Sequence, residues 1–84
     1  MTEAKKLVLK YWSIIAQLPV EFLEASFDSS DWMKDRAIKC AIAETEAVIE
    51  AIDNADTIAL NFGHDYRQEL VNKQNIWIEL TQMQ

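Results

Sequence analysis

Residues 31–62, DWMKDRAIKCAIAETEAVIEAIDNADTIALNF, contain neither glycine nor proline and set the expected architecture. Their apolar side chains recur at alternating steps of three and four residues, which is the period of one face of an α-helix. The stripe consists of Ile38, Ala41, Thr45, Val48, Ile52, Ala55, Ala59 and Phe62, and Ile42 and Ile49 widen it. We therefore expect one long amphipathic helix over about residues 30–62.

Both ends of this helix carry recognisable signals. Ser29 and Ser30 can accept hydrogen bonds from the first free backbone N–H groups, and Asp31 lies where the helix dipole favours negative charge. Gly63 can adopt a positive φ just after the last periodic position, and so predicts the end of the helix. Acidic and amide side chains within residues 53–56 compete for backbone hydrogen bonds, so a kink there is an alternative to a continuous helix.

Three shorter segments complete the expected bundle. Residues 3–18 carry a helical apolar stripe, and the only proline ends this helix and can open a short second one over residues 19–27. A last helix follows the only glycine, with Asp65 as its N-cap. Residues 76–81 also alternate like a strand, but no other segment offers a partner strand, so helix is favoured. The sequence predicts a single all-α domain, residues 1–84, with three to four helices.

Charge is strongly segregated along the chain, whose formal net charge is −6. Between Lys39 and Arg67 there is no lysine or arginine. The acidic residues of that interval are Glu44, Glu46, Glu50, Asp53, Asp56 and Asp65. One end of the molecule should therefore present negative potential that attracts a basic partner over roughly 8 Å at physiological salt. The same charge disfavours direct binding to nucleic acid.

The apolar content is high for so short a chain, at 50% of residues. A domain of this size buries only about 60% of the surface that its unfolded chain exposes. Apolar residues in excess of a small core then lie at an interface, so the composition predicts a homodimer or a tightly packed bundle, and we favour the homodimer.

Several features bear on the compartment. The single cysteine, Cys40, excludes an internal disulfide and favours a reducing environment, and its place inside the long helix predicts a small buried thiol. No apolar run is long enough for a transmembrane helix, and the basic start leads into an amphipathic segment rather than a signal peptide. We expect a cytoplasmic protein that does not bind membranes.

Residues for catalysis or metal binding are sparse. The only histidine, His64, is distant in sequence from Cys40, and no Glu-x-x-His pair or phosphate-binding glycine loop occurs. We therefore assign no catalytic, cofactor-binding or metal-ligating residue, and expect that the protein is not an enzyme.

These patterns favour a small acidic interaction module, which acts as a regulator, adaptor or inhibitor of a protein partner with a basic surface. The alternative is an acidic decoy, of the kind found in phages or mobile elements, that mimics nucleic acid and blocks a nucleic-acid-binding protein. Trp32 either plugs the end of the bundle or serves as a surface anchor. The residues expected to contact the partner are Trp12 and Trp32 through apolar surface and Glu46, Glu50, Asp53 and Asp56 through charge.

Overall fold

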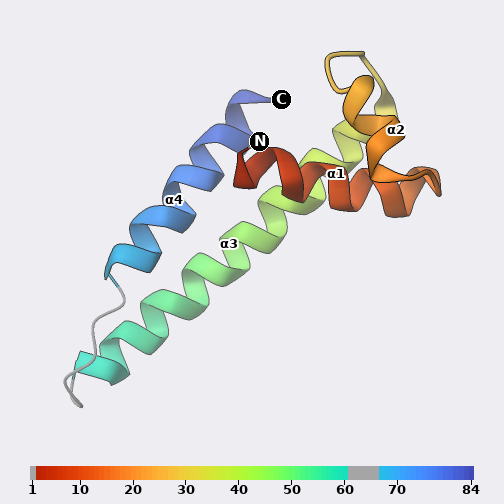
Figure 1. Ribbon diagram of the computed structural model, residues 1–84. Coiled ribbons are helices and arrows are strands. Elements are labelled where there is room, and N and C mark those ends of the chain that lie inside the picture. The colour runs from red at the N-terminus through yellow and green to blue at the C-terminus, as the bar shows by residue number, and fades with distance from the viewer. Residues whose placement is uncertain (1, 61–66) are drawn as a thin grey trace.

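A computed structural model describes residues 2–60 and 67–84, and the side chains of residues 2–54 and 68–84. The described residues form four helices and no strand: α1 (Glu3–Ala16), α2 (Val20–Ala25), α3 (Trp32–Leu60) and α4 (Arg67–Gln82). Figure 1 shows α3 as the long element against which α1 and α4 pack. The predicted all-α bundle with a long central helix is confirmed, and residues 76–81 are helical.

The start of α3 differs from the sequence expectation. The sequence favours Ser29 or Ser30 as the cap, but the side chain of Asp31 takes this role. Its Oδ1 accepts a hydrogen bond from the backbone N–H of Met33 over 2.8 Å. Asp31 directly precedes the first helical residue, which is the position from which a short side chain reaches the N–H two residues ahead. α3 continues through residues 53–56 as one uninterrupted helix. Phe62, with the predicted terminator and cap at residues 63 and 65, lies outside the described residues.

α1 ends at Ala16, two residues earlier than predicted. Gln17 adopts the left-handed conformation (φ 56°, ψ 41°), and its N–H donates to the carbonyl of Ser13. The reason is steric, because the residue before Pro19 is disfavoured in the helical region, so the chain leaves the helix before Leu18.

The buried face of α1 is rotated from the predicted stripe. The helical period predicts a stripe that includes Ile14 and leaves Leu9 and Trp12 beside or off it. In the structure Leu9 and Trp12 are buried, whereas Ile14 is 64% exposed. α1 contacts α3, α2 and α4, so the residues that it buries are those that face these neighbours. The core cluster consists of Ala4, Val8, Leu9 and Trp12 from α1, Leu23 from α2, Ala37, Ile38 and Ala41 from α3, and Leu80 from α4.

A lysine holds the connection between α2 and α3. Lys34 Nζ donates to the carbonyl oxygens of Phe27 and Ser29, each over 2.6 Å. The same ammonium lies 5.4 Å from the ring centroid of Phe27 and 6.0 Å from that of Trp12. Lys34 therefore joins the loop, α3 and the core residue of α1 through charge-assisted hydrogen bonds and cation–π contacts.

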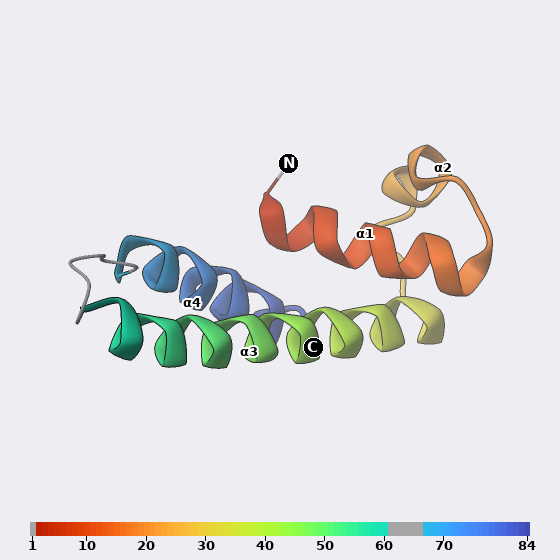
Figure 2. The same ribbon diagram turned by 90° about the horizontal axis from the view of Figure 1, so that it is seen from below.

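The molecule is elongated, with extents of 46 × 20 × 19 Å and a radius of gyration of 14.9 Å. A compact domain of this length would have a radius of gyration of about 12 Å. Figure 2 shows the cause: α1 lies over the half of α3 that begins at Trp32, and α4 lies beside the other half. The two ends of the bundle are thus built from different helix pairs.

We expect Asp31→Ala to lower the free energy of unfolding by about 1 kcal/mol, because the Met33 N–H loses its acceptor. Ser30→Ala is the matched control and should change that free energy by less than about 0.5 kcal/mol. Urea unfolding followed by circular dichroism measures both. If Ser30→Ala lowered the free energy of unfolding more than Asp31→Ala does, Ser30 would be the N-cap, as expected from the sequence.

Replacing Lys34 with methionine keeps most of the aliphatic stem but removes the donors to the loop carbonyls. We expect a loss of roughly 1–3 kcal/mol in unfolding free energy, as for hydrogen bonds that involve a charged group. Lys39→Met, at an exposed site of the same helix, should be close to neutral. Equal effects of the two substitutions in denaturant unfolding would show that the loop contacts do not stabilise the fold.

Candidate protein-interaction groove

An open groove of about 510 Å³ runs between α3 and α4. Each helix contributes one wall, and the two helices run in opposite directions (Figure 1). Three carboxylates that the sequence marked as partner-binding lie together on the α3 wall. The lining residues are Glu46, Ile49, Glu50 and Asp53 from α3 and Gln74, Trp77 and Ile78 from α4.

One hydrogen bond joins the two walls. Trp77 Nε1–H donates to Glu46 Oε1 over 3.0 Å, across 31 positions in the sequence. The indole is half-buried while the carboxylate is exposed, so the ring presents an apolar face at the groove and its polar edge is satisfied. Aromatic residues of this kind are enriched at protein interfaces. The sequence did not mark Trp77 for this role, because its hydrogen-bond partner lies 31 positions away.

α4 carries an exposed apolar stripe separate from the core, and Ile78 of this stripe lines the groove. Val71 and Ile78 are each 46% exposed, and their spacing of seven residues places them on one side of the helix. Ile76 and Leu80, which pack into the core, lie on a different side of α4. The spacing of Val71 and Ile78 was the available signal in the sequence that α4 has two apolar faces.

Both predicted tryptophan anchors lie away from the groove. Trp12 is 2% exposed and belongs to the core, so it is removed from the contact surface expected from the sequence. Trp32 is 65% exposed and does not plug the bundle, and the Arg36 guanidinium carbon lies 5.7 Å from its ring centroid. Trp32 precedes Glu46 by 14 positions, or about 21 Å along a helix, so the structure does not bring this ring to the acidic wall.

Two further predictions from the sequence concern Asp56 and Cys40 on α3. Asp56 lies in the helix, but its side chain is outside the described part of the chain. Cys40 is exposed, so the predicted buried thiol is wrong. The cause is helical geometry, because a residue directly before the buried Ala41 points about 100° away from it around the axis.

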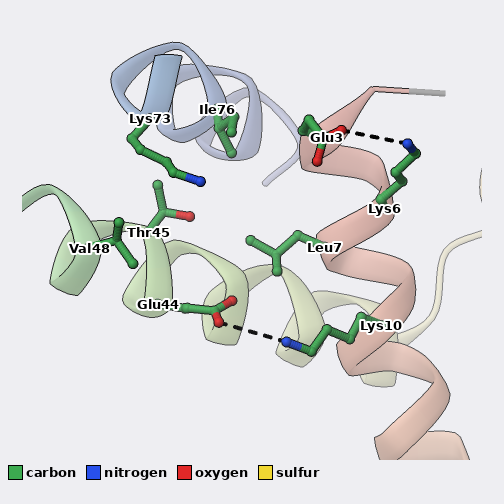
Figure 3. Close-up of a pocket in the computed structure, with 9 residues that line it drawn as sticks. All are labelled: Glu3, Lys6, Leu7, Lys10, Glu44, Thr45, Val48, Lys73 and Ile76. Atoms are coloured by element: carbon green, nitrogen blue, oxygen red, sulfur yellow. Dashed lines mark ion pairs between the residues drawn. The ribbon is translucent and has the colours of Figure 1, made fainter. Parts of the chain in front are cut away.

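A second hollow, of about 270 Å³, lies where α1, α3 and α4 meet (Figure 3). Its rim carries charges of both signs. Lys6 Nζ lies 3.6 Å from a Glu3 carboxylate oxygen, and Lys10 Nζ lies 3.8 Å from Glu44 Oε1. The second pair connects α1 to α3, although partly exposed pairs of this kind contribute little stability. Three lysines and two glutamates line this hollow, so charges of both signs surround it.

Tyr11 on α1 responds to the same glutamate. Partial burial raises the pKa of the Tyr11 hydroxyl above its ordinary value of 10.0, and the nearby negative charge of Glu44 raises that pKa further. Both effects disfavour the tyrosinate form. This coupling reports how closely α1 is packed against α3.

Two observations limit other kinds of site within the described residues. No group of three or more histidine, cysteine, aspartate and glutamate side chains that could hold a metal ion occurs there. In the same part of the chain, no helix combines the length and apolar character required to cross a bilayer.

We expect Glu44→Gln to lower the pKa of Tyr11 toward 10.0, because the negative charge beside the phenol is removed. The pKa is measured from tyrosinate absorbance in a Tyr66→Phe background, which leaves one phenol. Since the folded pKa is raised, the associated stability is present below pH 10 and is lost as the pH rises through the folded pKa. An unchanged titration midpoint would contradict the assigned contact.

Comparison of the chain with protein-family models, with curated proteins and with solved structures finds no match. The case for a function therefore rests on the chemistry of the groove and its surroundings.

Proposed function

We propose that this protein is a small interaction module that binds the basic surface of a protein partner through the α3–α4 groove. In that role it acts as a regulator, adaptor or inhibitor of the partner. The observation that carries the proposal is the convergence of Glu46, Glu50 and Asp53 with the exposed aliphatic surface of α4 in one groove.

The composition of the groove supports a protein partner. Protein interfaces combine an apolar centre with a polar rim and are enriched in aromatic residues. Here Ile49, Trp77 and Ile78 supply the apolar surface, and the three carboxylates supply acceptors for lysine or arginine. The negative potential of the α3 wall also accelerates the approach of a positively charged partner.

The acidic decoy remains the alternative. Carboxylates that replace phosphates account for the charge of α3, but they do not account for an apolar wall opposite the charge. A decoy's complex should weaken steeply as salt rises, as complexes with nucleic acid do. An interface with a substantial apolar area should lose much less affinity over the same range.

The predicted homodimer is retained as part of the proposal. Four exposed aliphatic or aromatic residues gather around the end of α1 and along α2, where they would suit a second copy: Ile14, Leu18, Val20 and Phe22. This surface and the α3–α4 groove lie on different elements, so self-association and partner binding are compatible.

The test is a triple variant, E46Q/E50Q/D53N, which removes the charges and retains similar side-chain shapes. Its control, E21Q/E24Q/D28N, removes three exposed charges from α2 and the following loop. Tagged forms of both variants and of the unaltered chain are used to capture proteins from the native lysate at low and high salt. We expect the groove variant to lose the partner and the control variant to retain it. In the proposed complex the groove carboxylates contact basic residues of the partner, whereas the carboxylates of the control do not.

Circular dichroism verifies that both variants remain helical. Equal loss of the partner by both would mean that net charge, rather than the groove, drives binding. Retention by the groove variant would show that the groove carboxylates do not hold the partner, which contradicts the proposal. A nucleic-acid-binding partner released at high salt would favour the decoy, and recovery of untagged copies alone would favour a self-assembling protein.

A further inference from the structure

We infer that the segment that occupies the groove is a single amphipathic helix of the partner, with lysine or arginine along the edge that faces α3 and apolar residues facing α4. This inference rests on the proposed function and specifies the chemistry of the partner. The helical shape and the one-sided charge follow from different observations.

The helical shape follows from the spacing of the wall residues. On α3, Glu46, Ile49 and Asp53 follow each other at steps of three and four residues. On α4, the lining residues Gln74 and Ile78 are four residues apart. Steps of three and four are the period with which helices present side chains to a neighbouring helix in a packed seam. Both walls therefore present their side chains at the period into which a neighbouring helix packs its own side chains.

The arrangement of the helices supports the same occupant. α1 lies over the N-terminal half of α3, so α4 is the only described helix beside much of the C-terminal half (Figure 2). α4 already places Ile76 and Leu80 in the core and still exposes Val71 and Ile78. A third helix laid into the groove would bury this second face and complete a local three-helix bundle.

The one-sided charge follows from the difference between the two walls. The α3 wall contributes Glu46, Glu50 and Asp53, whereas the α4 wall contributes Gln74, Trp77 and Ile78, none of which is charged. A bound helix with basic residues all around would place some of them against apolar α4, where desolvation of a charge is costly. Complementarity therefore restricts the basic residues to one edge and sets the rotation of the helix about its axis.

The probe is a synthetic 18-residue peptide, a length of about five helical turns, with leucine along one face and lysine along one adjoining edge. A scrambled peptide of identical composition lacks this periodicity. Binding is measured by isothermal titration calorimetry, and the site is located from the indole ¹⁵N–¹H signals of the protein. We expect the periodic peptide to shift the Trp77 signal and leave that of core Trp12 in place, and the scrambled peptide to bind about tenfold or more weakly.

A matched pair of variants tests the location. Ile78→Lys places a positive charge on the α4 wall, where it opposes a basic helix and interrupts the apolar contact. Trp32→Lys places the same charge at an exposed apolar residue of α3, outside both the groove and the surface assigned to the homodimer. We expect the first to weaken binding of the periodic peptide by about tenfold or more and the second to leave it nearly unchanged.

Several outcomes would overturn the inference. Equal binding of the two peptides would mean that the groove recognises basic charge without helical shape, which leaves the proposed function intact. If the periodic peptide does not bind while capture from the lysate still depends on the groove carboxylates, the helical occupant is rejected and the proposed function stands. Equal weakening by Ile78→Lys and Trp32→Lys would place the site elsewhere.

Two further results separate the inference from the proposed function. Self-association in analytical ultracentrifugation that Ile78→Lys abolishes would make a second copy of this chain the occupant. If the periodic peptide does not bind and capture from the lysate does not depend on the groove carboxylates, both the helical occupant and the proposed function are rejected.

Discussion

The contact between α1 and the first half of α3 is the constraint on which the other features depend. Ala4 on α1 and Ala37 and Ala41 on α3 are fully buried, and such small side chains let two helices approach closely. Trp12 fills the space beside this contact and meets the edge of the Phe27 ring, with centroids 6.3 Å apart. The largest fully buried side chain among the described residues is thereby committed to the core rather than to a partner.

Helix length then explains why a groove exists. A helix of 14 residues is about 21 Å long, whereas one of 29 residues is about 43 Å long, so α1 covers only part of α3. α4 covers the remaining part from one side. A chain of 84 residues has no further described helix to cover the other side, and the elongated shape is the direct result.

The charge pattern follows the same division of α3. Glu44 lies where α1 still reaches, and Lys10 of α1 lies beside it. The carboxylates that follow along α3 line the groove with Trp77, which is positioned by its hydrogen bond to Glu46. The acidic surface therefore lies where apolar residues of α4 remain exposed, and this coincidence of charge and apolar area distinguishes the groove from the mixed-charge hollow beside α1.

The amino-acid sequence by itself determined the helical class, the long α3 and the concentration of acidic residues on its second half, because helical period and local charge are properties of consecutive residues. Three of the six predicted contact residues, Glu46, Glu50 and Asp53, lie together in the groove for this reason. Only the tertiary structure decided that α1 buries Leu9 and exposes Ile14, since the rotation of a helix about its axis depends on the neighbours that cover it. The pairing of Trp77 with Glu46 across 31 positions likewise arises from the way α4 folds back on α3, which no local pattern encodes.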